Sequence, residues 1–446
     1  MKPKAPIRQA QRELFRVELD LLIDQAHALV KLGRQINWAG FEESLGRTYA
    51  AMNGAPGVST RLMVALHYLK YQHDLSDEAV VEQWVENPYW QHFSGEQFFQ
   101  HEMPIDPSSM TRWRKRLGEA GAEAMLKETI ETGLRLKVIT PAQIQRINVD
   151  TTVQTKAVRF PTDARLYNRA RERLVKTARK LGLHIKQSYE RVGPRLLMQQ
   201  SRYAQAREPK RAAGCTRKLR THLGRVIRQI ERQHPASNGQ LVELLTTAKQ
   251  IHAQQRQDKS KVYSVHEPKV ACIAKGKAGK KYEFGNKVSV ATTSRGGWLL
   301  GALSLTGNPY DGHTLEQQLA QVRRFVWHKI KATPEAYVDM GYRGHNHTGP
   351  ETVHIDKRRR GSTPKSLWRW MKRRAAVEPT IGHLKSEHRL ERNRLKGTLG
   401  DAINALLSAA AMNFQKLQGF FLLLWLRLCS RLWLPPPVIL ISPVIA

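Results

Sequence analysis

Hydrophobic positions over the first 140 residues recur at helical spacing, so this part of the chain is expected to be all helical. Its clearest face follows a Ser59 cap and consists of Leu62, Ala65, Leu66 and Leu69. Helices with one such apolar face must bury it against one another, which predicts a helical N-terminal region with its own hydrophobic contacts.

A basic segment, DPSSMTRWRKRLG, lies near the end of this region. Ser108 or Ser109 is suited to cap a short helix that shows several cations around Trp113: Arg112, Arg114, Lys115 and Arg116. A basic helix behind a capped turn is typical of the DNA-reading element of a helix-turn-helix. An ordinary solvated basic helix anchored by one tryptophan has the same pattern.

The period changes to two at QRINVDTTV, which predicts a strand with Asp150 near its end. Helical spacing returns from about 158 to 260, in a very basic segment without any strand pattern, which predicts a helical insertion. Within it, Arg165, Arg169 and Arg173 are four residues apart, as in a stripe along DNA phosphates or a solvated helix face.

Strand patterns resume at YEFGNKVSVATT, and the SRGG turn before WLLGALSL predicts a hairpin. Thr314 and Gln317 have capping-box spacing, which predicts that DGHTLEQQL opens a helix through about Trp327. PEAYVDMGYRG then predicts a short strand that ends at Asp339, and TVHI at 352–355 predicts another.

Charge narrows the class of partner. The chain has 73 Lys and Arg residues against 38 Asp and Glu, a formal net charge of +35. So large an excess attracts polyanions and supplies the phosphate contacts that dominate non-specific DNA affinity. Nucleic acid is therefore the leading partner.

Length and cysteine content bound the architecture. With 446 residues and 41% hydrophobic content, the chain is expected to form two or three domains. Cys215, Cys272 and Cys429 are too far apart for a zinc or disulfide framework, which fits a reducing cytoplasm. The N-terminus lacks a signal-peptide core, and the apolar C-terminal run from 420 to 434 contains two arginines before a triple proline, so we expect a packing helix rather than a membrane anchor.

Three acids occupy comparable positions: Asp150 and Asp339 at strand ends, and Glu378 near a helix start. Two-metal phosphoryl chemistry needs several carboxylates that converge on Mg²⁺ or Mn²⁺. Taken alone, however, a strand-end aspartate is more often a turn or cap residue. Asp311 in NPYDGHTL is a rival ligand, although its place before the expected capping box favours a turn role.

Glu378 lies between two cations, Arg374 four residues before it and Lys385 seven residues after it. Regular helical offsets would bring all three to roughly one face. Pro379 disfavours the helical conformation at the preceding residue, so we expect Glu378 at a helix start or a kink. Lys385 then lies about two turns along the helix, whereas Arg374 need not share that face.

Four motifs occur in one order: NVDTTVQT, GNPYDGHTL, YVDMGYRGH and VEPTIGHLKSEHRLERNRLKG, followed by GDAINALLSAAAMNF. With these motifs the chain resembles the DDE transposases of bacterial insertion sequences, specifically the fifth insertion-sequence family. The resemblance covers nearly the whole chain. It implies an α/β fold with an RNase H-like catalytic core.

The resemblance also implies roles for individual residues. The catalytic triad and metal ligands would be Asp150, Asp339 and Glu378, with Mg²⁺ as cofactor and Mn²⁺ as a substitute. The family's tyrosine, arginine, glutamate and lysine pattern places Arg374, Glu378 and Lys385, with Met371 at the tyrosine position. That departure removes a hydroxyl but no metal ligand. The expected DNA contacts are Arg374, Lys385, Arg343, Arg112 and Arg114.

The expected architecture has a helical DNA-binding region at 1–140, an RNase H-like core at 141–157 and 261–415, a basic helical insertion at 158–260, and an apolar tail at 416–446. The expected function is cleavage of element ends and their joining to target DNA. Two alternatives stay open: an RNase H-like nuclease without strand transfer, and a catalytically inactive DNA-binding protein. We expect a homodimer on double-stranded DNA in the bacterial cytoplasm, associated with the nucleoid and not with a membrane.

Overall fold

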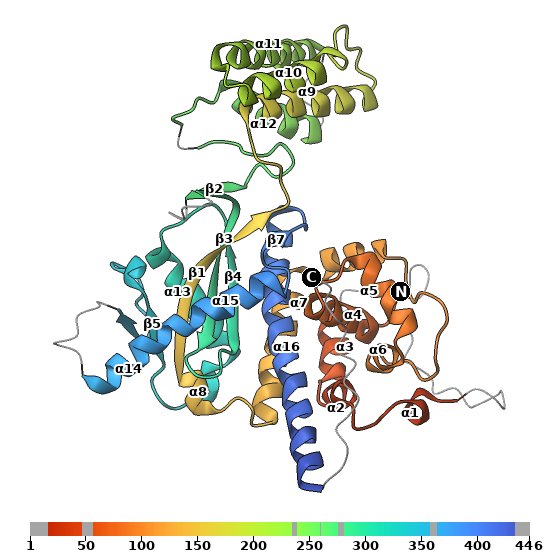
Figure 1. The fold of residues 1–446 in the computed structure, drawn as a ribbon, viewed down its shortest axis with the longest axis vertical. Coiled ribbons are helices and arrows are strands. Elements are labelled where there is room, and N and C mark those ends of the chain that lie inside the picture. Colours follow the sequence, from red (N-terminus) through yellow and green to blue (C-terminus); the bar gives the residue numbers. More distant parts are fainter. Residues whose placement is uncertain are drawn as a thin grey trace.

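The computed structural model describes residues 17–46, 57–233, 239–258, 260–274, 281–356 and 364–432. Figure 1 shows three groups of elements: N-terminal helices, a central sheet with flanking helices, and a cluster of helices joined to the sheet by a thin neck. The fold is mixed α/β, and helices account for most of its regular structure.

Helices make up the N-terminal group, as the hydrophobic spacing predicts: α1 (Leu19–Leu22), α2 (Ala28–Gly33), α3 (Trp38–Gly46), α4 (Thr60–Gln72), α5 (Asp77–Glu86), α6 (Pro88–Phe93) and α7 (Ser108–Arg135). The predicted face of α4 is buried, with Leu66 and Leu69 fully inaccessible. The predicted short helix is the first part of α7, which starts at Ser108 and ends at a kink at Gly118, where a φ of 64° suits glycine. A second helical part of α7 continues from the kink to Arg135.

The central sheet has seven strands: β1 (Arg146–Lys156), β2 (Ala271–Ala274), β3 (Tyr282–Thr293), β4 (Leu299–Leu305), β5 (Glu335–Val338), β6 (Thr352–Ile355) and β7 (Arg392–Asn393). β1 lies at its centre, antiparallel to β3 on one side and parallel to β5 on the other. β4 and β2 extend the sheet beyond β3, and β6 extends it beyond β5. β7 pairs with the far end of β1.

The sequence predicted most strands of this sheet, including the β3–β4 hairpin. Gly296 and Gly297 form its turn at positive φ, as the SRGG pattern requires. The predicted capping box was wrong. Helix α13 (Asp311–Phe325) begins three residues earlier, and the Thr314 hydroxyl donates to the Asp311 carbonyl oxygen instead of capping the helix.

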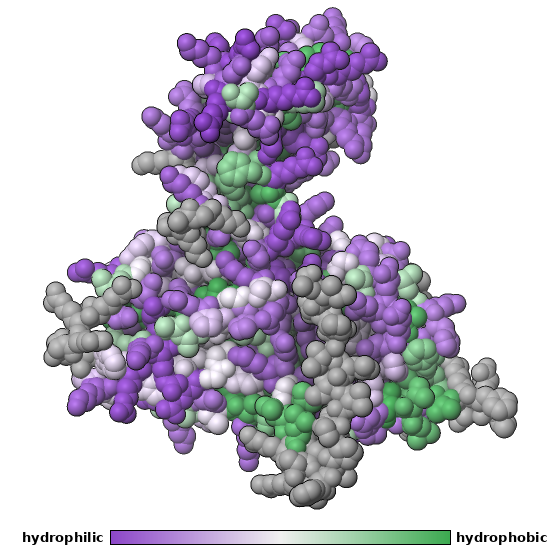
Figure 2. Space-filling model, viewed as in Figure 1, coloured by the Kyte–Doolittle hydropathy of each residue, from purple (hydrophilic) through white to green (hydrophobic). Residues whose placement is uncertain are grey.

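The segment between β1 and β2 folds into four helices: α9 (Asp163–Lys180), α10 (Val192–Gln205), α11 (Pro209–Gln233) and α12 (Gly239–Ala253). They bury a hydrophobic cluster of their own, separate from that of the sheet. Its members include residues predicted from helical spacing: Leu223, Val226, Ile227, Ile230, Leu241, Leu244 and Ala248. Figure 2 shows that the outer surface of this cluster is strongly hydrophilic.

Helix α16 (Gly397–Leu432) joins the N-terminal helices to the sheet in one hydrophobic core. Asn413 fixes its position, because the side-chain amide accepts from the Leu299 N–H of β4 at 2.9 Å and donates to its carbonyl oxygen at 2.8 Å. The same amide donates to the Thr129 hydroxyl of α7 at 3.1 Å. Within the described part of the chain, no helix is both long and apolar enough to cross a membrane.

Six shorter elements complete the sheet layer. Helix α8 (Pro141–Gln145) precedes β1, and the 3₁₀ turns η1 (Trp327–Lys329) and η2 (Met340–Tyr342) flank β5. Helix α14 (Lys365–Arg373) continues through the 3₁₀ turn η3 (Arg374–Ala376) into α15 (Val377–Ser386). Figure 1 shows α14 and α15 crossing in front of the sheet.

Acidification is expected to destabilise the N-terminal helices through His67. This α4 residue is fully buried, with Nδ1 2.7 Å from the Met63 carbonyl oxygen. Burial first, and then the charge of Arg114, lower the pKa of His67 from 6.5 to about 3. Between those two values the unfolded chain binds a proton that the folded chain excludes. Stability therefore falls as the pH drops, by up to about 1.4 kcal/mol per pH unit.

The measurement is the melting temperature between about pH 7 and about pH 5. We expect the drop to be smaller in His67→Gln than in the wild type, because glutamine has no proton to gain. The matched control is His101→Gln, which changes an exposed histidine. Equal drops in the wild type and His67→Gln would contradict this assignment.

Candidate active site

Two adjacent strands bring together the first two predicted acids. β1 and β5 pair in parallel, with Asn148 opposite Tyr337. Continuing that register by two residues places Asp150, inside β1, opposite Asp339, which directly follows β5. The prediction that Asp150 lies near the end of its strand was wrong, because β1 continues to Lys156. The two acids are neighbours because the short strand β5 pairs with the first part of β1 and ends directly before Asp339.

Asp150 is the most perturbed acid of this site. Its side chain is 18% exposed, and its Oδ1 accepts from the Thr151 N–H at 2.7 Å. Burial first, and then the charges of Asp339 and Asp311, raise the pKa of Asp150 to about 6, against the opposing effects of the Thr151 N–H and Arg374. A carboxyl group with this environment carries negative charge that the protein only partly compensates.

Arg374 lies beside Asp150, with Nη1 3.7 Å from Oδ2. Its side chain is only 11% exposed, and its buried Nε has no hydrogen-bond partner among the described residues. The resemblance had implied a DNA contact for Arg374, and here its guanidinium offsets part of the aspartate charge.

Asp339 and Asp311 face the same small space. Asp339 caps η2, and its Oδ1 accepts from the Gly341 N–H at 2.9 Å. A Cβ on Gly341 would lie 3.0 Å from Asp339 Oδ1 and 3.3 Å from Asp311 Oδ2, so the glycine lets both carboxylates approach. Only a residue without a side chain fits there at no steric cost.

Asp311 has firmer partners than a turn residue requires. It begins α13, and its Oδ1 accepts from the Thr151 hydroxyl at 2.8 Å and from Lys287 Nζ at 2.9 Å. Sequence reasoning favoured a turn role for Asp311 because it precedes the expected capping box, which the structure does not form. Thr151 and Lys287 lie far from Asp311 in sequence, so no local pattern could have predicted these contacts.

Tyr342 lies beside the three aspartates. Its side chain is fully buried, and its hydroxyl is close to that of Ser289. Burial, followed by the charges of Asp150, Asp311 and Asp339, raises the pKa of Tyr342 well above its usual range. The Tyr342 hydroxyl therefore stays protonated and adds no negative charge beside the three aspartates.

The third acid lies on a different element. Glu378 is exposed, as the second residue of α15 and four residues after Arg374. This confirms the prediction that Pro379 marks a helix start. Lys385 is half-buried near the end of the same helix, and Arg343 is exposed directly after η2. As these side chains stand, no three Asp, Glu, His or Cys residues of the described ranges form a set that could hold a metal ion.

The two predicted DNA contacts on α7 differ in accessibility. Arg112 is exposed, and its guanidinium contacts the hydroxyls of Ser108 and Ser109. Arg114 is 4% exposed, and its Nη1 donates to Asp77 Oδ1 at 2.8 Å. In this structure Arg112 is open to DNA, whereas Arg114 holds two helices together.

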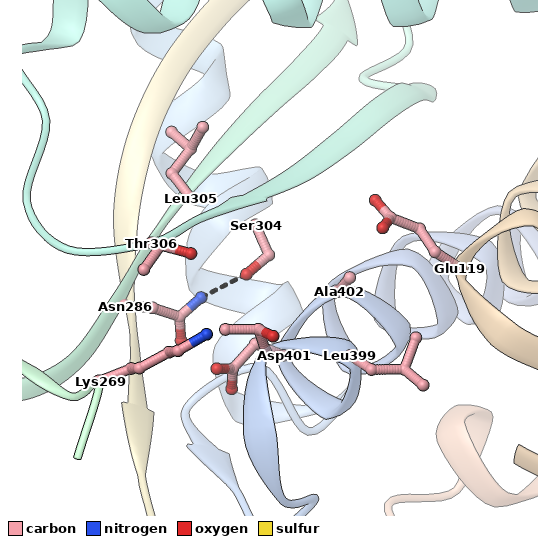
Figure 3. Close-up of a pocket in the computed structure, with 10 residues that line it drawn as sticks. Glu119, Lys269, Asn286, Ser304, Leu305, Thr306, Leu399, Asp401 and Ala402 are labelled. Carbon is pink, nitrogen blue, oxygen red and sulfur yellow. Dashed lines mark hydrogen bonds between the residues drawn. The ribbon is translucent and has the colours of Figure 1, made fainter. Parts of the chain in front are cut away.

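A separate hollow lies between β3, β4, α7 and the start of α16, and Figure 3 shows the residues that line it. Its volume is 280 Å³. Its polar lining includes Asn286, whose side-chain amide donates to Ser304, together with Lys269 and Asp401. None of the three predicted catalytic acids lines it, so the acidic space at Asp150 and this hollow are distinct.

Comparison with known proteins identifies the class. Residues 17–116 match the family described as a transposase domain (DUF772), and residues 342–418 match the family described as a transposase DDE domain. The chain thus carries two transposase domains, and the second includes Arg374, Glu378 and Lys385.

The chain is also similar to a protein of known sequence over nearly half of its length. A protein of Rhizobium meliloti, described as "Uncharacterized protein ORF8 in nfe locus", is 51% identical over 208 residues, which are 47% of this chain and 100% of that protein. The chain belongs to the same family as this rhizobial protein. No solved structure matches the chain. Membership of the fifth insertion-sequence family stays a prediction.

Proposed function

We propose that the chain is the transposase of a bacterial insertion sequence of the fifth family. It would bind the ends of its element, cleave a phosphodiester bond there and join the exposed 3′-hydroxyl to target DNA. The observation that carries this proposal is the juxtaposition of Asp150 and Asp339 on neighbouring strands. The transposase-domain matches and the net charge of +35 support it.

The sheet supports an RNase H-like core. Its strand order β4-β3-β1-β5-β6, with β3 antiparallel to both neighbours and β1, β5 and β6 parallel, is the arrangement of that fold. The first acid lies on the central strand and the second after the neighbouring strand. In this proposal the four insertion helices interrupt the core after its first strand.

The acids suit a hard divalent cation, Mg²⁺ or Mn²⁺. Asp150 and Asp339 offer the oxygen ligands that such ions prefer, and the raised pKa of Asp150 reflects a negative charge that a cation would compensate. Glu378 is the proposed third ligand. The bound ion would supply Lewis-acid stabilisation of the phosphoryl oxygens and activation of the attacking oxygen.

The protein's own cations would orient the DNA strand. Arg374 is already held beside Asp150, where a phosphodiester entering the site would meet its guanidinium. We expect the guanidinium to exchange the carboxylate for phosphate oxygens, because a planar guanidinium binds phosphate in a bidentate manner. Lys385 and the exposed Arg343 would contact the same strand, and Lys287 with Thr151 would keep Asp311 in place.

The N-terminal transposase domain is proposed to bind the element ends. Arg112 is the accessible candidate on α7, and pairing of two ends predicts a homodimer on DNA. Such a protein would act on the nucleoid in the bacterial cytoplasm. Exposed cations of α14, Lys365, Arg369, Lys372 and Arg373, would add backbone contacts close to the acids.

Glu378→Gln tests the role of the third acid. We expect Mg²⁺-dependent cleavage of a duplex that carries the element's terminal repeat to fall by about 100-fold or more, because one anionic ligand is lost. Affinity for the duplex should change by less than about threefold. The matched control is Glu387→Gln, an exposed acid at the end of the same helix. Equal activity of the two variants would remove Glu378 from the mechanism.

The products of the same assay separate the alternatives. Cleavage followed by joining to a second duplex supports a transposase, whereas cleavage without joining supports a nuclease. Tight binding of the terminal repeat without metal-dependent cleavage would indicate an inactive DNA-binding descendant.

A further inference from the structure

A groove lies where the insertion helices join the sheet. Its volume is 540 Å³, and three segments form its walls: residues 156–161 leaving β1, residues 263–267 returning from α12, and residues 393–396 between β7 and α16. One face of α9 closes it. In Figure 1 this place is the neck between the insertion helices and β7.

The groove has a marked excess of positive charge. Five exposed cations line it: Arg159, Arg165, Arg169, Arg394 and Lys396. Its two carboxylates are already compensated. Glu172 lies 3.1 Å from Arg169, and Glu267 lies 3.6 Å from the buried Lys156 Nζ and accepts from the Gly397 N–H. The groove's cations outnumber its carboxylates, so they repel one another, and a polyanion would relieve that repulsion.

The wall after β7 shows why its cations face outward. Asn393 is 1% exposed and Leu395 is half-buried, whereas Arg392, Arg394 and Lys396 are exposed, so the side chains alternate as in a strand. The inward residues hold the segment in place. Among the described residues, Arg394 and Lys396 take part in none of the ion pairs, which leaves their charge to solvent.

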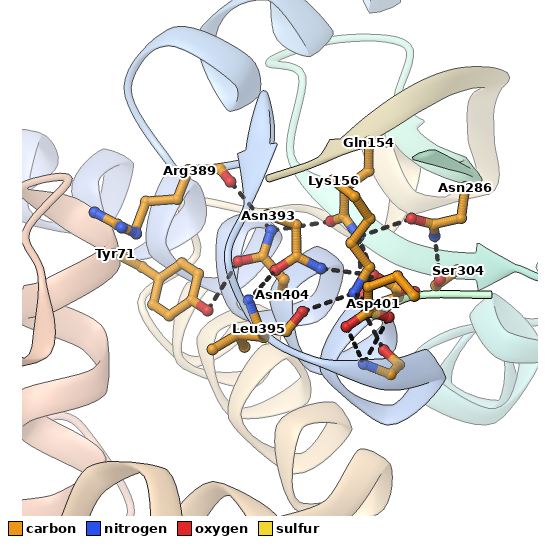
Figure 4. Close-up of polar contacts among 12 residues, drawn as sticks. Tyr71, Gln154, Lys156, Asn286, Ser304, Arg389, Asn393, Leu395, Asp401 and Asn404 are labelled. Carbon is orange, nitrogen blue, oxygen red and sulfur yellow. Dashed lines mark hydrogen bonds and ion pairs between the residues drawn. The ribbon is translucent and has the colours of Figure 1, made fainter. Parts of the chain in front are cut away.

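A buried network fixes the three walls to one another, as Figure 4 shows. Lys156 Nζ is 2.7 Å from Asp401 Oδ1 and donates to the Leu395 carbonyl oxygen at 2.7 Å. Asn393 donates to the same aspartate oxygen at 2.6 Å. With Glu267 on the other side of Lys156, each wall contacts this one ammonium group, so the groove is preformed.

The groove lies within reach of a duplex held at the acids. Lys156 follows Asp150 by six residues along β1, a distance of about 20 Å at the rise of a strand. That length equals about six base pairs of duplex. Arg394 also lines a second hollow of 260 Å³ with Lys385, Arg389 and Arg392. Asp74, which pairs with Arg389, and Glu391 line it too, so an excess of cations over acids extends from α15 to the neck.

We propose that this groove binds the phosphate backbone of the duplex whose end occupies the acidic site, about six base pairs from the scissile bond. The inference rests on the proposed function for the location of the DNA end. It assigns the neck a role in holding DNA that is separate from both the N-terminal domain and the acids.

The test uses the full chain with Arg159→Ala, Arg394→Ala and Lys396→Ala combined. Binding to a 30-base-pair duplex is measured at several salt concentrations. We expect the affinity near 0.1 M salt to fall by about tenfold or more, and the slope of log affinity against log salt to decrease by about 2 to 3. The matched control removes three exposed cations of α11 that do not line the groove, Lys210, Arg217 and Lys218. Figure 1 shows α11 on the side of the insertion helices away from the sheet.

Phosphate-ethylation interference on a pre-cut terminal repeat then locates the contact. In the wild type we expect interference about six base pairs from the cut, and in the groove variant its loss at that position alone. An unchanged pattern, or an equal loss of affinity in the α11 control, would overturn the proposal. A third outcome separates the two proposals. If the wild type never cleaves, but the groove variant shows a reduced slope of log affinity against log salt and loses the interference near the cut, the groove binds DNA and the transposase proposal fails.

Discussion

Replacing Asp150 with asparagine is expected to reduce Mg²⁺-dependent cleavage by about a thousandfold or more while the protein stays folded and bound to DNA. Asp150 is the proposed metal ligand on the central strand. The neutral amide of the asparagine that replaces it would be a poor ligand for a hard cation. A loss of several kcal/mol of charge stabilisation in the transition state corresponds to this factor. Single-turnover cleavage of the terminal repeat measures it.

The stability of this variant has an expected sign. Asp150 is partly buried beside Asp339 and Asp311, which raise its pKa after burial itself does. Removing its charge relieves the repulsion, so the melting temperature should stay the same or rise. The control is Asp163→Asn, which removes an exposed acid at the start of α9. Undiminished cleavage by the Asp150 variant would exclude this residue from the chemistry.

Local patterns predicted the strands of this fold well. β1 and β3 are recognisable because hydrophobic and polar residues alternate along them, and Asp150 and Asp339 stand out as acids within or directly after such a pattern. The parallel register of β1 and β5 then makes the two acids neighbours. A one-residue offset would have turned one of them to the other face of the sheet.

Contacts between segments that are distant in the chain could not be predicted from the sequence. Arg114 has the same local pattern as Arg112, yet it is buried because Asp77 reaches it from α5, 37 residues away. Asp311 is held by Thr151 and Lys287 for the same kind of reason. No periodicity records which distant charge meets a given arginine or aspartate, because that depends on how the helices pack.

The structure of the neck also depends on contacts between segments that are distant in the chain. Lys156 is a lysine at the end of a strand, where a solvated side chain is the ordinary expectation. It is 5% exposed because Asp401, Glu267 and the carbonyl oxygens of Leu395 and Gly397 converge on it from three segments. The groove that these segments enclose could be found only in three dimensions.

Replacing Asp77 with alanine is expected to destabilise the protein by about 3–5 kcal/mol. Asp77 lies between two buried cations, Lys70 and Arg114, whose side chains are 6% and 5% exposed. Burial opposes the charge of Asp77, but the hydrogen bonds and charges of Arg114 and Lys70 hold its pKa well below the usual range. Without the carboxylate, two cations would stay buried side by side.

Urea unfolding followed by tryptophan fluorescence measures this loss, with Glu78→Ala, an exposed neighbour, as control. The wild-type contribution has a defined pH window. A depressed folded pKa means that the stabilisation is complete above the unfolded value of 3.8 and is lost as the pH falls below it toward the folded pKa. The difference between wild type and Asp77→Ala should therefore shrink in acid.

Replacing Asp77, Lys70 and Arg114 together shows whether the loss of stability in Asp77→Ala comes from uncompensated charge or from lost packing. If the cost of Asp77→Ala comes from uncompensated cations, the combination of Asp77→Leu, Lys70→Met and Arg114→Met should recover most of it, since apolar side chains of similar volume need no counter-charge. If the combined variant is as unstable as Asp77→Ala, the ion pairs are not the source. Retained duplex affinity in the combined variant would also exclude Arg114 as a DNA contact of α7.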